Sequence, residues 1–208
     1  MGILIVPSLL SANLAFLADD IVKVEKGGAD ALHIDVMDGH YVDNFAFSVD
    51  FTAAVKKHTK LMISSHLMID NPDKYLAAFA NAGSDFIVVH PEVCPDVLKT
   101  LKKINSLGSS PCLCLKPYQS FDVIKPYVGE LTLILLMTVE PGFGGQEFMF
   151  DMLPKIINIR EYLNFMGLKT YIGCDGGIKL DTVGVAARAG ADYLIAGNSI
   201  FNSSDIVQ

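Results

Sequence analysis

Short apolar runs return along the whole chain at a nearly constant interval, and this recurrence limits the possible folds more than any other feature. The eight runs are continuous rather than alternating, as expected for parallel strands that are covered on both faces. They end roughly 27 residues apart on average, which is about the length of one βα unit. The predicted strands are Ile3–Leu9, Ala31–Met37, Leu61–Met68, Phe86–His90, Pro111–Lys116, Leu131–Val139, Thr170–Asp175 and Tyr193–Gly197.

Amphipathic stretches separate these runs and predict helices. Asn71-Pro72 is typical of a helix start, a capping residue followed by proline in the first turn. A short sequence of small residues followed by aspartate ends at Asp30, and similar sequences end at Asp85 and Asp192. Each copy lies between a predicted helix and the next predicted strand. The expected helices cover residues 14–27, 48–58, 71–82, 94–107, 119–127, 149–166 and 180–190.

Eight βα units with no linker and no shift in composition predict an α/β fold, a single (β/α)8 TIM barrel that forms one domain over residues 1–208. A doubly wound open sheet is the alternative. Only Ser199–Gln208 follow the last predicted strand. We therefore expect the last helix to be short or truncated.

Composition excludes several classes of function. The formal net charge is -7, from 16 Lys and Arg against 23 Asp and Glu, and no basic cluster is present, so a nucleic-acid partner is not expected. No apolar run approaches the roughly 18 residues of a membrane helix. Cys94, Cys112, Cys114 and Cys174 have no CxxC spacing and are expected to be reduced and buried in a cytoplasmic protein.

Polar side chains at the strand ends predict a metal site. His33 and Asp35 share one face of the second strand by its period of two, His66 ends the third strand, and Asp175 ends the seventh. Catalytic groups of barrels lie at these ends, and this donor set suits one divalent ion, Zn²⁺, Fe²⁺, Mn²⁺ or Co²⁺. A buried, hydrogen-bonded His–Asp pair without metal is the alternative.

Other strand ends leave more than one interpretation open. Met37, Met68 and Met137 are either core residues or a dry, polarisable cover for an electron-rich intermediate. Lys116 ends the fifth predicted strand, where a lysine could form a Schiff base, so an aldolase is an alternative activity. His90 and Glu92 are either additional site groups or structural hydrogen-bonding residues.

Glycine-rich segments follow the last three predicted strands. Residues 141–146 are too glycine-rich for a structural role alone and predict a mobile lid. Gly176-Gly177 and Gly197-Asn198 match the position at which barrels bind phosphate through backbone N–H groups. Such a site needs no cationic side chain.

Taken together, these residues closely resemble the ribulose-phosphate 3-epimerase family over essentially the whole chain. Several phrases in the right order carry the resemblance: Pro7-Ser8-Leu9-Leu10-Ser11-Ala12, His33-Ile34-Asp35-Val36-Met37-Asp38-Gly39-His40, His66-Leu67-Met68, Met137 through Gln146, and Asp175-Gly176-Gly177-Ile178.

The resemblance implies a phosphate-binding TIM barrel that is a carbohydrate epimerase, an isomerase of the pentose phosphate pathway. Asp35 and Asp175 then correspond to the two acid/base carboxylates of a metal-dependent epimerisation at C3, from D-ribulose 5-phosphate to D-xylulose 5-phosphate through an enediolate. His33, Asp35, His66 and Asp175 correspond to the metal ligands. The implied substrate-binding residues are Ser8, His66, Gly142, Phe143, Gly144, Gly145, Gly176, Gly177, Gly197 and Asn198.

Departures from the family pattern bear on the substrate. Asp43 stands where proline is usual, Asn198 replaces a frequent serine, and Cys174 replaces valine. His90-Pro91-Glu92 looks more like the related allulose-6-phosphate 3-epimerases, so conversion of D-allulose 6-phosphate to D-fructose 6-phosphate is the alternative activity. The expected partner is a small sugar phosphate, with no nucleic acid and no membrane, and the chain is expected to form a homo-oligomer.

Overall fold

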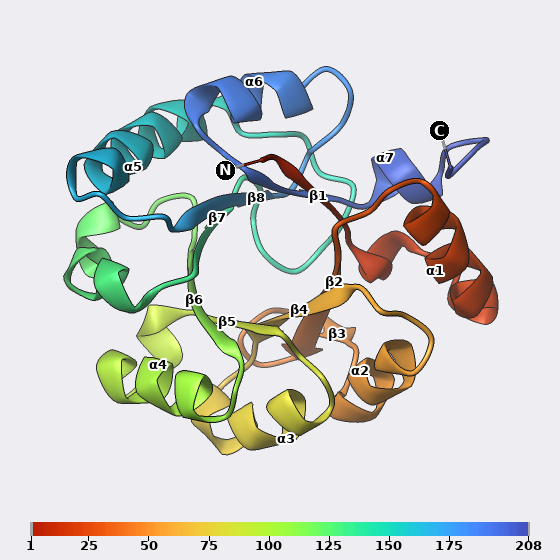
Figure 1. The fold of residues 1–208 in the computed structure, drawn as a ribbon, viewed down its shortest axis with the longest axis horizontal. Helices are drawn as coiled ribbons and strands as arrows, with labels where there is room; N and C mark the ends of the chain where they lie inside the picture. The colour runs from red at the N-terminus through yellow and green to blue at the C-terminus, as the bar shows by residue number, and fades with distance from the viewer. Residues whose placement is uncertain (1, 208) are drawn as a thin grey trace.

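Eight parallel strands close into a ring in the computed structural model, which describes residues 2–207. The order in the sheet is β1-β9-β8-β7-β6-β5-β4-β2, and a parallel bridge between Ser8 and His33 joins its two ends. Figure 1 looks down the axis of this ring. The predicted TIM barrel is confirmed. The strands are β1 (Leu4–Pro7), β2 (Ala31–Asp38), β4 (Met62–Met68), β5 (Phe86–Val89), β6 (Ser110–Leu115), β7 (Leu133–Met137), β8 (Tyr171–Asp175) and β9 (Tyr193–Ala196).

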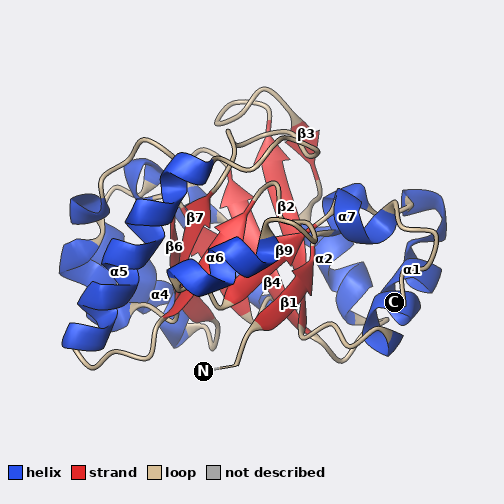
Figure 2. Ribbon diagram, turned by 90° about the horizontal axis from the view of Figure 1, so that it is seen from above, coloured by secondary structure: helices blue, strands red, loops and turns tan. Residues whose placement is uncertain are grey.

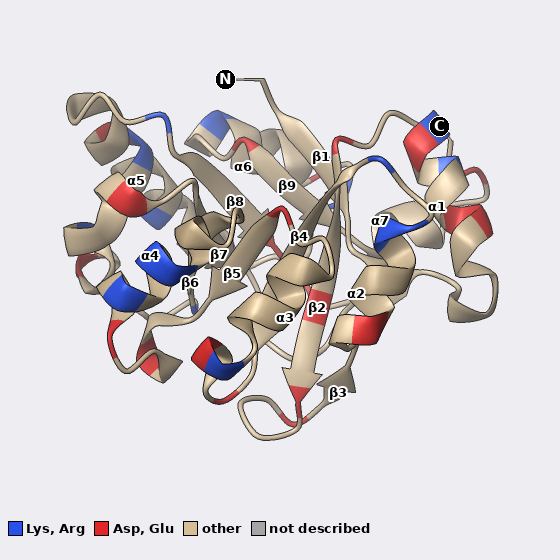
Figure 3. Ribbon diagram, turned by 60° about the horizontal axis from the view of Figure 1, so that its bottom comes forward, with Lys and Arg blue, Asp and Glu red and all other residues tan. Residues whose placement is uncertain are grey.

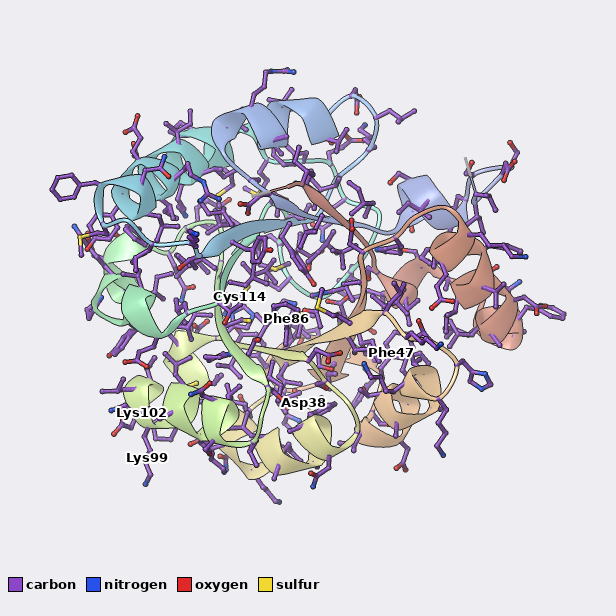
Figure 4. All side chains as sticks on the ribbon, in the orientation of Figure 1. Asp38, Phe47, Phe86, Lys99, Lys102 and Cys114 are labelled. Carbon is purple, nitrogen blue, oxygen red and sulfur yellow. The ribbon has the colours of Figure 1, made fainter. Side chains whose placement is uncertain are left out.

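The helices surround the ring of strands (Figures 1 and 2). In α4, Leu101 and Ile104 are buried, whereas Lys99 and Lys102 project outward (Figure 4). Charged residues are spread over the helices and loops around the ring (Figure 3). The helices are α1 (Leu17–Lys26), α2 (Val49–Lys56), α3 (Leu76–Asn81), α4 (Val97–Ser106), α5 (Leu153–Phe165), α6 (Val183–Ala189) and α7 (Asn198–Phe201). The short 3-10 helices are η1 (Leu9–Ser11), η2 (Leu14–Phe16), η3 (Pro72–Lys74), η4 (Pro91–Val93), η5 (Phe121–Val123), η6 (Lys125–Glu130) and η7 (Phe150–Met152).

Two local predictions were wrong. The helix expected over 119–127 is instead the pair of 3-10 helices η5 and η6, because Pro126 lacks an N–H and prevents a continuous α-helix. The first strand ends at Pro7 rather than Leu9, because Ser8 caps η1 by accepting the N–H of Leu10. The pattern also did not predict β3 (Phe45–Ala46), which pairs antiparallel with the end of β2.

The repeated phrase ending in aspartate has a common structural role. Asp30, Asp85 and Asp192 each lie just before a strand and accept a backbone N–H from the start of a neighbouring strand. Asp30 Oδ2 lies 2.8 Å from the N of Ile5, and Asp85 Oδ2 lies 2.8 Å from the N of Ile63. Asp192 Oδ1 lies 2.7 Å from the backbone N of Ile172. These bonds tie adjacent strands together at their amino ends.

Two apolar layers make up the core. Side chains such as Val6, Phe86 and Tyr193 pack inside the ring, and a larger cluster fills the space between the strands and the helices. Cys114 and Phe86 both lie inside the ring (Figure 4). All four cysteines are free and buried, as predicted: Cys94, Cys112, Cys114 and Cys174. Within residues 2–207, no helix has the length and apolar character needed to cross a bilayer.

Candidate metal centre and active site

Two histidines and two aspartates meet inside the carboxyl end of the barrel. His33 and Asp35 come from β2, His66 from β4 and Asp175 from the end of β8. The Nε2 of His33 lies 3.3 Å from Asp35 Oδ1 and 3.7 Å from Asp175 Oδ2. The Nδ1 of His66 lies 3.4 Å and 3.8 Å from the same two oxygens. The four donor atoms therefore face one common point.

These four side chains fit a divalent ion. One donor atom from each lies within 4.8 Å of all the others, and atoms that share a tetrahedral ion at 2.0–2.2 Å are about 3.3–3.6 Å apart. His33 Nε2 and His66 Nδ1 are buried and have no hydrogen-bond partner among residues 2–207. Since buried polar atoms are normally paired, a cation between the four groups would satisfy both atoms. A His33–Asp35 pair without metal stays the alternative, since these side chains lie 3.3 Å apart.

The electrostatics of the cluster keep Asp35 ionised. Burial by itself would raise the pKa of Asp35, but the neighbouring imidazoles of His33 and His66 hold the pKa of this carboxyl well below its usual range. Asp35 is thus a carboxylate at any physiological pH.

A cavity of about 330 Å³ opens above this cluster. Asp35 and Asp175 line it, together with Met37, Met68 and Met137, and the three methionines are almost completely buried. Their position agrees with a dry cover over the carboxylates. The cavity holds acidic groups at its base and thioethers around them.

The two histidines lie behind the carboxylates. His33 and His66 are completely buried and are not part of the cavity lining. The expectation that His66 binds substrate stays a prediction, and in this structure its side chain lies behind the lining. The other predicted substrate-binding residues all line the cavity: Ser8, Gly142, Phe143, Gly144, Gly145, Gly176, Gly177, Gly197 and Asn198.

The loop over residues 142–146 covers one side of the cavity and has few anchors. Asn44 Nδ2 donates to the carbonyl of Gly142 over 2.7 Å. Gln146 Nε2 donates to the carbonyls of Glu140 and Phe143 over 2.7 Å and 2.8 Å. The side chain of Phe143 is 58% exposed. The apolar side chain is therefore available to cover a bound molecule.

Glycine is required at the turn after β8 because no side chain fits there. Gly176 and Gly177 have φ values of 114° and 69°, the left-handed region that glycine adopts without strain. A Cβ on Gly177 would lie 2.3 Å from the backbone N of Phe148. Thr138 holds the same turn, since its Oγ1 donates to the carbonyls of Asp175 and Gly176 over 3.0 Å and 2.6 Å.

Lys116 is placed where it does not support a Schiff base. Its Nζ pairs with Glu92 Oε1 over 3.1 Å and lies 4.3 Å from the ring centre of Tyr41. Lys116 is not part of the cavity lining. A lysine that is held by a carboxylate outside the cavity is not positioned to attack a substrate carbonyl.

The sequence reasoning missed several lining residues. Ser11, Lys179 and Ser199 line the cavity, and Ser199 Oγ donates to the carbonyl of Ile178 over 2.7 Å. Ser11 belongs to the phrase that begins at Pro7, and Ser199 directly follows Asn198. The sequence phrases that identified the neighbouring site residues could therefore also have identified Ser11 and Ser199.

Comparison with known proteins agrees with this geometry. The profile of the Ribulose-phosphate 3 epimerase family matches residues 4–201. The chain is 43% identical over 202 residues to the ribulose-phosphate 3-epimerase of Bacillus subtilis (strain 168), covering 97% of this chain and 93% of that one. It is 38% identical to the ribulose-phosphate 3-epimerase of Synechocystis sp., covering 100% and 91%.

Solved structures of lower identity share the fold. KGPDC from Streptococcus mutans superposes with a TM-score of 0.73 at 14% identity, covering 100% of this chain and 93% of that one. A tryptophan synthase alpha-subunit from Pyrococcus furiosus gives 0.72 at 13% identity, covering 97% and 89%. With its full-length profile match and its curated relatives, this chain belongs to the ribulose-phosphate 3-epimerase family and is an isomerase.

Proposed function

We propose that this protein interconverts D-ribulose 5-phosphate and D-xylulose 5-phosphate by proton transfer at C3, with Asp35 and Asp175 as the two acid/base groups. The observation that carries the proposal is that carboxylates from two separate strands, β2 and β8, line the same cavity at the same donor cluster. The curated relatives, which are named ribulose-phosphate 3-epimerase, support the five-carbon substrate. They do not favour the allulose phosphate alternative.

Inversion at a carbon beside a ketone requires two proton carriers. One group removes the C3 proton from one face, and the other returns a proton to the opposite face. Asp35 is a carboxylate at the base of the cavity, within reach of a bound sugar. Asp175 reaches the same cavity from β8, which is separated from β2 by β9 and β1. A flat intermediate between the two carboxylates presents one face to each.

His33, Asp35, His66 and Asp175 would hold one divalent ion, Zn²⁺, Fe²⁺, Mn²⁺ or Co²⁺. When bound, such an ion supplies Lewis-acid stabilisation of the negative charge that develops on substrate oxygens. The protein itself fixes the two carboxylates relative to the histidines. This fixed geometry keeps both proton carriers at the cavity base.

The glycine loops at the carboxyl ends of β8 and β9 suit the substrate phosphate. Gly177, Gly197 and Asn198 line the cavity, and glycine lets backbone N–H groups approach an anion closely. Lys179, a basic residue of the lining, pairs with Glu147 over 3.2 Å. Backbone donors therefore carry the proposed phosphate contact.

The loop over residues 142–146 is proposed to close over the bound sugar phosphate. Its exposed Phe143 and its two glycines with positive φ, Gly142 and Gly145, suit a segment that changes conformation. Closure excludes water and slows elimination of phosphate from the intermediate.

The proposal includes a cytoplasmic role in pentose phosphate metabolism. The four free, buried cysteines support a reducing compartment. The homo-oligomer expected from the sequence stays a prediction.

A steady-state comparison of D-ribulose 5-phosphate and D-allulose 6-phosphate on enzyme of defined metal content tests the proposed function. We expect a much higher kcat/KM for ribulose 5-phosphate, and far slower reaction of free ribulose, because the phosphate orients the sugar. A higher kcat/KM for the six-carbon substrate would overturn the substrate assignment. Equal efficiency with free ribulose would overturn the phosphate contact.

A further inference from the structure

A second histidine lies directly behind the proposed metal ligand His66. The Nε2 atoms of His66 and His90 are 2.9 Å apart, and both side chains are completely buried. The rings stack with their centres 5.0 Å apart and their planes inclined by 26°. Two nitrogens that share one ion would lie about 3.3 Å apart, so the contact is that of a hydrogen bond.

The direction of this hydrogen bond follows from the role of the other ring nitrogen of His66, Nδ1. Its Nδ1 points at Asp35 and Asp175, where a ligand must offer a lone pair. A neutral imidazole carries one N–H, so the proton of His66 is on Nε2. His66 therefore donates to His90, and the Nε2 of His90 accepts.

The acceptor role at Nε2 leaves the proton of a neutral His90 on Nδ1. That atom is buried and has no hydrogen-bond partner among the described residues. Glu92 Oε1 lies 3.9 Å away. A carboxylate on this side favours the Nδ1–H tautomer by attraction.

Two side chains hold Glu92 in this position. The hydroxyl of Tyr41 donates to Glu92 Oε1 over 2.7 Å, and Lys116 Nζ lies 3.1 Å from the same oxygen. The ring of Tyr41 also packs on His90, with the ring centres 4.8 Å apart. His90 thus has the ring of Tyr41 on its face and the carboxylate of Glu92 3.9 Å from its Nδ1.

We propose that His90 is a positioning residue for the metal site: its Nε2 accepts the Nε2–H of His66 and so fixes the tautomer and the ring orientation in which His66 Nδ1 binds the ion. The inference rests on the metal site proposed above. His90 does not line the cavity and acts only through His66. Partners of this kind orient metal-binding histidines and raise their basicity.

Ring-nitrogen NMR of the ¹⁵N-labelled, zinc-loaded wild-type protein tests the hydrogen-bond direction without any substitution. We expect His66 to be protonated at Nε2 and His90 at Nδ1. The Nδ1–H form is the less common tautomer of free histidine, so its observation is informative. A His90 protonated at Nε2, or at both nitrogens, overturns the proposal.

Metal affinity of two variants tests the positioning role. His90→Gln keeps an acceptor near the position of Nε2, whereas His90→Phe keeps a ring and removes the acceptor. In a competition with a chromogenic chelator, we expect His90→Phe to bind Zn²⁺ about 10-fold to 100-fold more weakly than wild type. His90→Gln should stay within about threefold of wild type, since it preserves the hydrogen bond of His66.

Cys112→Ala is the matched control, because Cys112 is a buried thiol of the same strand as Cys114 and lies outside the cluster of His66, His90 and Cys114. We expect it to bind Zn²⁺ as wild type does. Unchanged affinity in a folded His90→Phe protein, or equal losses in the Phe and Gln variants, overturns the positioning role and leaves the metal site intact. Failure of the wild-type protein to bind Zn²⁺ overturns the metal site itself and this proposal with it. If His90→Phe does not fold, the Gln variant and the wild-type tautomer decide.

Discussion

Ser8 donates a hydrogen bond from its Oγ to Asp35 Oδ2 over 2.9 Å. The other oxygen of the same carboxylate, Oδ1, faces His33 and His66. The two oxygens of Asp35 therefore have separate partners, and Ser8 fixes the plane of the carboxylate. Ser8 follows the last residue of β1 and forms the bridge with His33 that closes the barrel.

Ser8→Ala is expected to lower kcat/KM by roughly 10-fold to 100-fold, because a hydrogen bond to a charged group contributes about 1.5–3 kcal/mol. Steady-state kinetics with ribulose 5-phosphate measure this loss. Ser65→Ala is the control, since Ser65 is also buried and hydrogen-bonded, to Ser84 over 2.7 Å, but lies outside the cavity lining. Equal losses in the two variants would show that Ser8 acts on folding alone.

Asp35→Asn and Asp175→Asn are each expected to lower epimerisation by roughly 10³-fold or more, because each removes one proton carrier and one charged ligand. One variant should still exchange the C3 proton of one epimer with solvent without inverting it. NMR of the substrate in D₂O follows both processes.

The same experiment on wild-type enzyme separates two bases from one. With two carboxylates, deuterium should enter C3 of the product almost from the first turnover, because a different group returns the proton. Return of the original proton to the product would point to a single base. Near wild-type rates in both Asn variants would remove the acid/base roles of Asp35 and Asp175.

Removal of the divalent ion with a strong chelator is expected to abolish turnover, and Fe²⁺, Mn²⁺, Co²⁺ or Zn²⁺ should restore it to different extents. His66→Ala should weaken ion binding by well over 10-fold, since one of four ligands is lost. His58→Ala is the control, because His58 is exposed and outside the cluster. Full activity in thoroughly metal-free protein would contradict the assignment.

Gly177→Ala is expected to raise KM for the sugar phosphate and to destabilise the fold, because its Cβ would overlap the backbone of Phe148 at 2.3 Å. Gly167→Ala separates this overlap from backbone strain. Gly167 has the same φ of 69°, and nothing lies within 4 Å of its added Cβ. We expect Gly167→Ala to lower stability modestly with KM unchanged, as measured by thermal unfolding and kinetics. A KM of Gly177→Ala equal to that of wild type would argue against phosphate binding at this turn.

Cys94 is expected to react with Ellman's reagent at pH 8 only after unfolding. Burial raises the pKa of Cys94 to about 12, and its thiol donates to the carbonyl of His90. A thiol that holds its proton more tightly in the folded state contributes stability below its ordinary pKa, and this contribution is lost as the pH rises from about 9 to about 12. The stability difference between wild type and Cys94→Ala should therefore shrink across that range. Rapid labelling of the native protein would contradict this placement.

The strand pattern predicted the barrel and its inner face because both depend on local order. In β2, the period of two places His33 and Asp35 on one side whatever the neighbouring strands do. By contrast, β3 has only two residues, too few to show a period. The α-helix expected at 119–127 does not form, because the missing N–H of Pro126 outweighs the apolar pattern of the segment.

Side-chain contacts between neighbouring strands could not be predicted from the sequence. The hydrogen bond from His66 to His90 joins β4 to the residue after β5 and depends on the register of the two strands. Tyr41, which packs on His90, comes from the loop after β2. The residues of each pair can be read from the sequence, but the distance between their side chains depends on how the strands pair in the closed barrel.

The three aspartates at the amino ends of the strands have a consequence for the opposite end of the barrel. A slip of one residue between neighbouring strands would turn every inward side chain outward. Asp30, Asp85 and Asp192 oppose such a slip at three of the seams. The register of the strands is thus fixed at the amino end of the barrel, whereas the proposed active site lies at the carboxyl end. The loops at the mouth can in this way differ in sequence, and so suit a different sugar, without disturbing the cluster of histidines and aspartates beneath them.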